Sequence, residues 1–161
     1  MNPVGQLLRV DDIRLDLDLS NPSQVLEEIA ALLGRQHGLP KTLILESLKM
    51  REQLGSTGVG HGFAIPHARM GQCVAATAAL LRTRFAIPFD APDGRPVSVF
   101  LGLIVPQKAN EGHLQLLATA AGMFSDRGIR DRLRTSTDPN ALRALLAAWP
   151  DLPAGSGGGA G

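Results

Sequence analysis

The sequence is poor in aromatic residues, with no tyrosine, one tryptophan and five phenylalanines among 161 residues. Proteins that hold single-stranded nucleic acids commonly stack the bases on aromatic side chains, so this composition argues against such binding. An excess of one charge sign is also missing, because 15 acidic and 16 basic residues leave a formal net charge of only +1. Since no basic stripe or acidic tail stands out, we expect no nucleic-acid partner.

Cysteine is nearly absent as well, since Cys73 is the single cysteine of the chain. One thiol excludes an internal disulfide framework and a zinc site built from several cysteines. The longest apolar runs, FLGLIVP and LRALLAAW, fall well short of the roughly 20 residues that a membrane-spanning helix needs. The N-terminus also lacks the basic segment and apolar stretch of a signal peptide. We therefore predict a cytoplasmic protein without membrane insertion.

The length and the apolar fraction fit a single domain. A chain of 161 residues that is 44% hydrophobic can fill one core, whereas two independent cores would be cramped. We predict one domain over residues 1–152, followed by a flexible tail over residues 153–161, which ends in GSGGGAG.

Hydrophobic patterns predict several strands. IRLDLDL, residues 13–19, alternates apolar and polar residues, as a half-buried strand does. A short strand is expected through FAIPH, residues 63–67, and a longer one over residues 76–89. PVSVFLGLIVP, residues 96–106, is almost entirely apolar, which favours a strand buried on both faces.

Capping residues and apolar periodicity predict about four helices between and after these strands. They begin near residues 22, 40, 113 and 139, and the first and last follow the cap-plus-proline pairs Asn21-Pro22 and Asp138-Pro139. The third helix has the clearest spacing, with apolar residues at 114, 117, 118, 121 and 124. Four or five strands interleaved with helices predict an α/β sandwich, in which helices flank a mixed β-sheet.

A glycine-rich stretch, GSTGVGHGFAIPHARM at residues 55–70, contains the candidate nucleophile. The neutral ring nitrogen of a histidine can attack a phosphoryl group. Because its pKa is about 6.5, much of a histidine is unprotonated near neutral pH. Pro66 fixes the backbone just before His67 and helps to aim the ring. We therefore predict that His67 accepts a phosphoryl group.

A transferred phosphoryl group also needs hydrogen-bond donors around its oxygens. Glycines let backbone N–H groups approach an anion closely, and nearby hydroxyls add further donors. The candidate phosphate-binding residues are Ser56, Thr57, Gly58 and Gly60. Arg51 precedes them at the end of the second predicted helix, and its guanidinium can offer a two-pronged contact.

A second histidine, His113, falls in the first turn of the helix that follows the buried strand, with Asn110 or Gly112 near the cap. Ligands of α/β proteins tend to bind where the carboxyl end of a strand meets the N-terminus of a helix. The helix dipole there favours a neutral imidazole and nearby anions. We expect His113 to donate a hydrogen bond to a phosphoryl group on His67.

Each of these residues also has an ordinary structural explanation. Most glycine-rich loops simply turn the chain, and GVGHG matches neither a P-loop nor a dinucleotide-binding fingerprint. His113 can be a solvated or capping residue, and Arg51 a surface arginine. His61, His67 and His113 together can bind zinc, but they lack a tight motif or a carboxylate partner, and we predict no metal. We expect His61 to be exposed and Cys73 to be a small packed residue.

Two long stretches resemble one known family. MREQLGSTGVGHGFAIPHA, residues 50–68, is similar to the active-site signature of IIA domains of the fructose/mannitol type. These domains belong to the bacterial phosphoenolpyruvate-dependent phosphotransferase system. GHLQLLATAAGMFSD, residues 112–126, resembles their second signature, and residues 89–106 resemble the stretch between the two. The resemblance spans roughly residues 7–149, and within the family the sequence is most similar to the nitrogen-regulatory branch.

The resemblance implies an α/β sandwich and a phosphoryl-carrier function without a cofactor. It implies that His67 is the residue that becomes tele-phosphohistidine, that His113 is the second active-site histidine and that Arg51 is the active-site arginine. The implied donor is an HPr- or NPr-type phosphocarrier. Regulated target proteins, such as a kinase or a transporter, are implied by the family but not identified by this sequence, and an oligomer is compatible with it.

Three functions remain open at this point. The chain can be a regulatory phosphocarrier, a sugar-transport IIA component that passes phosphate to a IIB domain, or a non-catalytic binding module that keeps the fold. The third is disfavoured, because His67, His113 and Arg51 are all present. A partner surface should be apolar around His67, with Phe63, Ile65 and Met70 as candidates unless they belong to the core.

Overall fold

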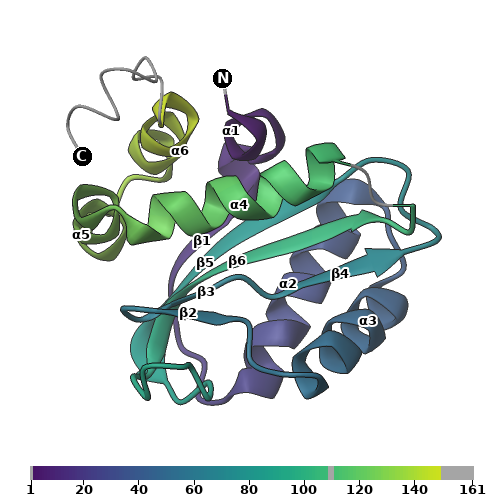
Figure 1. The fold of residues 1–161 in the computed structure, drawn as a ribbon, viewed down its shortest axis with the longest axis horizontal. Helices are drawn as coiled ribbons and strands as arrows, with labels where there is room; N and C mark the ends of the chain where they lie inside the picture. The colour runs from purple at the N-terminus through teal and green to yellow at the C-terminus, as the bar shows by residue number, and fades with distance from the viewer. Residues whose placement is uncertain (1, 109–110, 150–161) are drawn as a thin grey trace.

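The structure, a computed structural model, describes residues 2–108 and 111–149 (Figure 1). The strands are β1 (Ile13–Leu17), β2 (Gly58–Gly60), β3 (Phe63–Ala64), β4 (His67–Met70), β5 (Thr77–Ile87) and β6 (Val97–Pro106). The helices are α1 (Pro3–Leu7), α2 (Pro22–His37), α3 (Lys41–Gln53), α4 (Glu111–Ser125), α5 (Arg127–Thr135) and α6 (Pro139–Ala148), with a short 3₁₀ helix, η1 (Val10–Asp12).

The strands form one mixed sheet in the order β1-β5-β6-β3-β2, with β4 also paired to β6. β5 and β6 are antiparallel, whereas β1 runs parallel to β5. β3 and β4 follow one another along the same edge of β6, both parallel to it. Pro66 lies between them, and its carbonyl accepts a hydrogen bond from the N–H of Leu103 at 2.9 Å. β6 therefore holds the backbone on both sides of Pro66 and sets where His67 begins β4.

Helices cover both faces of this sheet, which confirms the predicted α/β sandwich (Figure 1). α2 and α3 pack on one face, while α1, α4, α5 and α6 pack on the other. β6 lies between the two apolar layers, and within it only Ser98 and Pro106 are less than fully buried. At Gly102 a methyl group would come within 2.6 Å of Ile29 on α2, so the glycine lets this helix lie directly against β6.

Some details differ from the sequence-based expectation. α1 and α5 were not predicted, and the expected short strand over residues 63–67 is divided between β3 and β4. The buried side of α4 consists of Leu116, Ala120, Met123 and Phe124, whereas Leu114 on the predicted stripe is 61% exposed. Phe124 of the predicted stripe is buried, and Leu117 and Ala121 are partly buried against the core. Periodicity therefore predicted the helix and part of its core-facing side, because α4 has apolar residues on more than one side.

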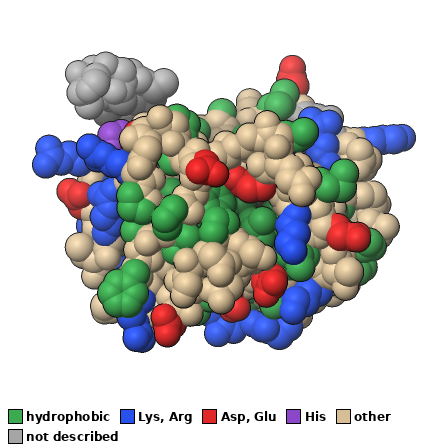
Figure 2. Space-filling view, turned by 90° about the horizontal axis from the view of Figure 1, so that it is seen from below, with side chains coloured by type: hydrophobic (Ala, Val, Ile, Leu, Met, Phe, Trp, Pro, Cys, Tyr) green, Lys and Arg blue, Asp and Glu red, His purple; other side chains and the backbone are tan. Residues whose placement is uncertain are grey.

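The described residues contain no helix that is long and apolar enough to cross a membrane. Figure 2 shows one face of the molecule, where acidic and basic side chains are interspersed around an apolar hollow. The tail over residues 153–161 lies outside the described residues, as does Asn110 near the start of α4. The division at residue 152 stays a prediction.

Candidate functional site

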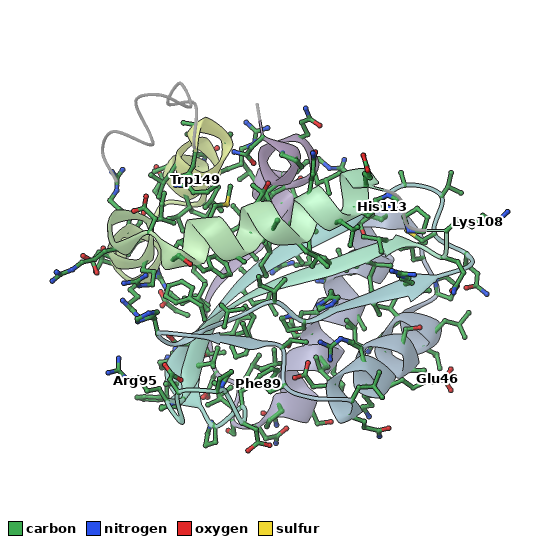
Figure 3. All side chains as sticks on the ribbon, viewed as in Figure 1. Glu46, Phe89, Arg95, Lys108, His113 and Trp149 are labelled. Carbon is green, nitrogen blue, oxygen red and sulfur yellow. The ribbon has the colours of Figure 1, made fainter. Side chains whose placement is uncertain are left out.

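Three residues singled out in the sequence line one cavity of about 610 Å³. Arg51 reaches it from the last turn of α3, His67 from the start of β4 and His113 from the first turn of α4. Figure 3 shows His113 at the end of α4 that lies over the carboxyl ends of β4 and β6. The structure therefore brings together two histidines and an arginine that are far apart in the sequence.

The hydrogen bond of the His67 ring defines its tautomer. Nδ1 lies 2.7 Å from the backbone carbonyl oxygen of Ile65. A carbonyl oxygen can only accept a hydrogen bond, so Nδ1 carries the proton in the neutral ring. The lone pair then resides on Nε2, which makes Nε2 the nucleophilic atom.

The surroundings of His67 favour this neutral form. Burial lowers the pKa of His67 below its ordinary value of 6.5, and the positive charge of Arg51 acts in the same direction. The hydrogen bond to Ile65 and the negative charge of Glu52 oppose the shift in pKa without cancelling it. At neutral pH the ring is therefore unprotonated at Nε2 and ready to attack an electrophile.

Two arginines, Arg51 and Arg69, line the cavity, and Arg51 is the one that acts on the pKa of His67. The Nη1 of Arg51 donates a hydrogen bond to the carbonyl oxygen of Gly55 at 2.8 Å, just beyond the end of α3. A guanidinium has five N–H donors in a planar fork, so other N–H groups of Arg51 remain to contact an anion in the cavity. A phosphoryl group on His67 is the kind of anion that this fork fits.

The predicted phosphate-binding loop lies beside the cavity rather than in its lining. The N–H and the hydroxyl of Thr57 donate to the carboxylate of Glu52 at 2.8 and 2.7 Å. The hydroxyl of Ser56 donates to the carbonyl of Phe89 at 2.6 Å and accepts from the N–H of Gly58 at 3.0 Å. These donors hold the turn together, so a phosphate contact from Ser56 or Thr57 stays a prediction that their present partners do not favour.

The glycines of this loop have packing and backbone roles. A methyl group at Gly58 would come within 2.8 Å of Ala91, so the glycine permits a close approach of two segments. Gly60 adopts a positive φ of 92° in β2, a conformation that favours glycine. Both lie outside the lining of the cavity, and their phosphate contacts also stay a prediction.

His61 and Cys73 lie away from the cavity lining, as expected for residues without a part in the chemistry. His61 is exposed, and its N–H donates to a carboxylate oxygen of Asp93 at 2.8 Å. Cys73 is buried, its thiol donates to the carbonyl of Ala75 at 2.9 Å, and burial raises its pKa. Among the described residues, no three His, Cys, Asp or Glu side chains gather as metal ligands do.

The apolar surface next to His67 was predicted from the wrong residues. Phe63, Ile65 and Met70 are at most 4% exposed, so they belong to the core. The apolar side chains that border the cavity come instead from α3, its C-cap and α4: the exposed Met50, Leu54 and Leu114, and the half-buried Leu117. Of these, Leu54 is 85% exposed and Leu114 is 61% exposed. We call these four residues the apolar rim.

Comparison with known proteins agrees with this geometry. Residues 6–149 match the family described as phosphoenolpyruvate-dependent sugar phosphotransferase system, EIIA 2. The chain belongs to this family. The resemblance found in the two signature stretches of the EIIA 2 family is thereby confirmed.

Individual relatives share the fold and much of the sequence. A nitrogen regulatory protein of Pseudomonas aeruginosa is 44% identical over 126 residues, which cover 76% of this chain and 80% of the relative. The crystal structure of nitrogen regulatory protein IIA-Ntr from Neisseria meningitidis superposes with a TM-score of 0.85 at 42% identity, covering 89% of this chain and 98% of that one. A fructose-specific EIIA component of Haloferax volcanii is 32% identical over 103 residues, covering 64% of this chain and 67% of the relative.

Proposed function

We propose that this EIIA protein is a nitrogen-regulatory phosphocarrier that accepts a phosphoryl group on Nε2 of His67 from an HPr- or NPr-type carrier. The observation that carries the proposal is the hydrogen bond from Nδ1–H of His67 to Ile65, which leaves Nε2 as the nucleophile inside the cavity. The two nitrogen regulatory proteins described above support the regulatory role.

The transfer is a displacement at phosphorus. The Nε2 lone pair of His67 forms the new N–P bond while the N–P bond of the donor phosphohistidine breaks, and the bonding pair returns to the donor's ring nitrogen. Nδ1 of His67 keeps its proton throughout and donates it in a hydrogen bond to the Ile65 carbonyl. The step therefore needs no proton transfer. The positive charge that develops on the ring is adjacent to the negative phosphoryl group.

Arg51 and His113 have the positions to hold the transferred group, since both line the same cavity as His67. Prearranged donors of this kind stabilise the charge on the equatorial oxygens, which is the main task in phosphoryl transfer. Because these side chains supply the electrostatic stabilisation, we expect the isolated transfer step to proceed in the presence of EDTA.

Mass spectrometry of the intact protein tests the proposal directly. The purified chain is mixed with phosphoenolpyruvate, the first enzyme of the system and an HPr- or NPr-type carrier. We expect the mass of one phosphoryl group to be gained and then lost on brief acid treatment, as phosphohistidine requires. No mass gain with either carrier, while the carriers themselves become phosphorylated, would show that the proposal is wrong.

A sugar-transport role is a second candidate, favoured by the 32% identity to the fructose-specific EIIA component. The same three cavity residues serve both roles, because each begins with phosphorylation of a histidine. The phosphorylated chain is therefore offered to a purified fructose-type or mannitol-type IIB domain. Rapid transfer to the IIB domain identifies a transport component, whereas retention of the label supports the regulatory role.

The pH dependence of phosphoryl acceptance follows from the surroundings of His67. Because burial lowers the pKa of His67 below 6.5, more than half of the rings are still unprotonated at Nε2 at pH 6.5. We expect the single-turnover rate with preformed phosphocarrier to fall with acidity and to reach half of its neutral value only below pH 6.5. A rate that already halves at or above pH 6.5, with a donor that remains phosphorylated, would contradict the lowered pKa.

The apolar rim is the expected contact surface of the phosphocarrier. Leu114→Asp puts a charge at the edge of the cavity, and we expect the KM for the phosphocarrier to rise about tenfold, the effect of roughly 1.4 kcal/mol at an interface residue. The rate at saturating carrier should change little. Phe85→Asp is the matched control, because Phe85 is 69% exposed and lies outside the cavity lining. An equal rise in KM for both variants would argue against docking at the rim.

A further inference from the structure

A chain of hydrogen bonds connects the end of α3 to the ring of His67. The carboxylate of Glu52 accepts two bonds from Thr57, one from its N–H at 2.8 Å and one from its hydroxyl at 2.7 Å. The carbonyl of Thr57 accepts from the N–H of Ile65 at 3.0 Å. The carbonyl of Ile65 in turn accepts from Nδ1–H of His67 at 2.7 Å.

We propose that Glu52 and Thr57 are positioning residues for His67, which hold the Ile65 carbonyl on Nδ1 so that the ring presents Nε2 to the donor. This inference rests on the proposed function, because it gives the tautomer its purpose. Neither residue lines the cavity, so neither touches the reacting atoms.

The chain of bonds acts through position rather than through electronic polarisation. The N–H and the carbonyl of Ile65 belong to different peptide planes, as do those of Thr57, so charge is not passed along one conjugated unit. What the bonds fix is the location of each residue. Thr57 is only 5% exposed, and both of its bonds to Glu52 are partly buried, which reduces competition from water.

Pro66 completes the restraint on the Ile65 carbonyl. A residue before proline is confined to extended conformations, which limits the directions that its carbonyl can take. The N–H of Ile65 donates to the carbonyl of Thr57, and the carbonyl of Pro66 accepts from the N–H of Leu103. These two hydrogen bonds hold the peptide between Ile65 and Pro66 from both sides. A carbonyl held in this way keeps its oxygen on Nδ1 and so favours the tautomer with the proton there.

Two carboxylates on α3 allow a matched comparison. Glu52 holds Thr57, whereas Glu46 is exposed earlier on the same helix, where Figure 3 labels it. Glu52→Ala removes both bonds, while Glu52→Gln can keep them, since its amide oxygen accepts from the N–H of Thr57 and its amide nitrogen donates to the hydroxyl. Glu46→Ala removes a carboxylate from the helix without touching the chain of bonds.

The first readout needs no phosphoryl donor. Nitrogen NMR of the histidine rings in the intact protein reports which nitrogen of His67 carries the proton. We expect Nδ1–H to dominate in the wild type, Glu46→Ala and Glu52→Gln, and the population of Nε2–H to grow in Glu52→Ala. In the phosphorylation assay we expect Glu52→Ala to lose about ten- to a hundredfold in single-turnover rate, as when a metal-ligating histidine loses its outer partner.

Thr57 is tested by a pair of substitutions. Thr57→Val removes the hydroxyl, and we expect a mixed tautomer and a slower transfer, whereas Thr57→Ser restores the bond and should restore both properties. Thr83→Val is the control for stability, because Thr83 is 3% exposed and its hydroxyl donates to the carbonyl of Phe85 at 2.6 Å, away from the site. Its tautomer and rate should match those of the wild type.

The outcomes separate this inference from the proposed function. If the wild type is phosphorylated but Glu52→Ala and Thr57→Val leave the tautomer unchanged, the positioning role is wrong and the phosphocarrier function stands. If the tautomer responds but the wild type never gains a phosphoryl group, the positioning holds and the proposed function fails. A loss in Glu52→Gln equal to that in Glu52→Ala would overturn the geometric role in favour of charge alone.

Discussion

Replacement of His67 by alanine is expected to abolish phosphorylation of this protein completely. The variant removes the ring whose Nδ1–H is held by Ile65 and whose Nε2 is the nucleophile. We expect no gain of mass after prolonged incubation with phosphoenolpyruvate, the first enzyme and an excess of carrier. His67 is only partly buried, so the fold should be retained, which circular dichroism and thermal unfolding can verify.

Two neighbours decide whether this result is specific to His67. Ser47 and His113 also line the cavity, and a hydroxyl or a second imidazole is an alternative acceptor. We expect His113→Ala to be phosphorylated fully but more slowly, because His113 holds the transferred group without receiving it. A phosphoryl group that persists in His67→Ala, or disappears in His113→Ala, would assign the acceptor to a different residue.

The sequence is most informative where a feature depends on nearby residues. Asn21 was expected to cap a helix, and its side chain accepts from the N–H of Gln24 at 2.9 Å. Gly38, which follows the last residue of that helix, has a left-handed φ of 68° at the C-cap. The apolar run of β6 correctly indicated burial on both faces. Caps, turns and periodic burial depend on residues that are only a few positions apart. They can therefore be predicted from the local sequence.

The loop before His67 shows what the sequence does not reveal. The sequence identified Ser56 and Thr57 as hydrogen-bond donors, but the acceptor that each donor meets depends on the fold. The partner of the Ser56 hydroxyl is the carbonyl of Phe89, which is 33 residues away. Glu52 is close in sequence, yet it meets Thr57 only because α3 ends and the chain turns back between them. Hydrogen-bond capacity was predictable, whereas its use within the turn was not.

The apolar residues near the site show the same limit. Phe63 and Leu114 are both large hydrophobes within the signature stretches, but the first is fully buried and the second is 61% exposed. Burial depends on which side of an element meets the opposite layer, and α4 is apolar on more than one side. The side not used by the core faces the cavity and forms part of the apolar rim.

Replacement of Arg51 by glutamine is expected to slow phosphoryl acceptance by about a hundred- to a thousandfold, the usual cost of removing one prearranged donor from a transition state. The loss should appear in the single-turnover rate at saturating phosphocarrier, since Arg51 acts on the transferred group. Lys49→Gln is the matched control, because Lys49 is an exposed cation of α3 outside the cavity lining. Equal losses in Arg51→Gln and Lys49→Gln would show that the net charge of α3, rather than the Arg51 fork, supports the reaction.

The pH profile of Arg51→Gln separates the two effects of the guanidinium. Burial is the main cause of the lowered pKa of His67, and the charge of Arg51 lowers it further. Without that charge the pKa of His67 rises, more of the ring is protonated at a given acidic pH, and the acid limb of the rate profile moves to higher pH. Arg51→Lys keeps a positive charge but loses the planar fork. It should therefore keep the wild-type acid limb and still lose much of the rate; full recovery of the rate would mean that charge alone stabilises the phosphoryl group.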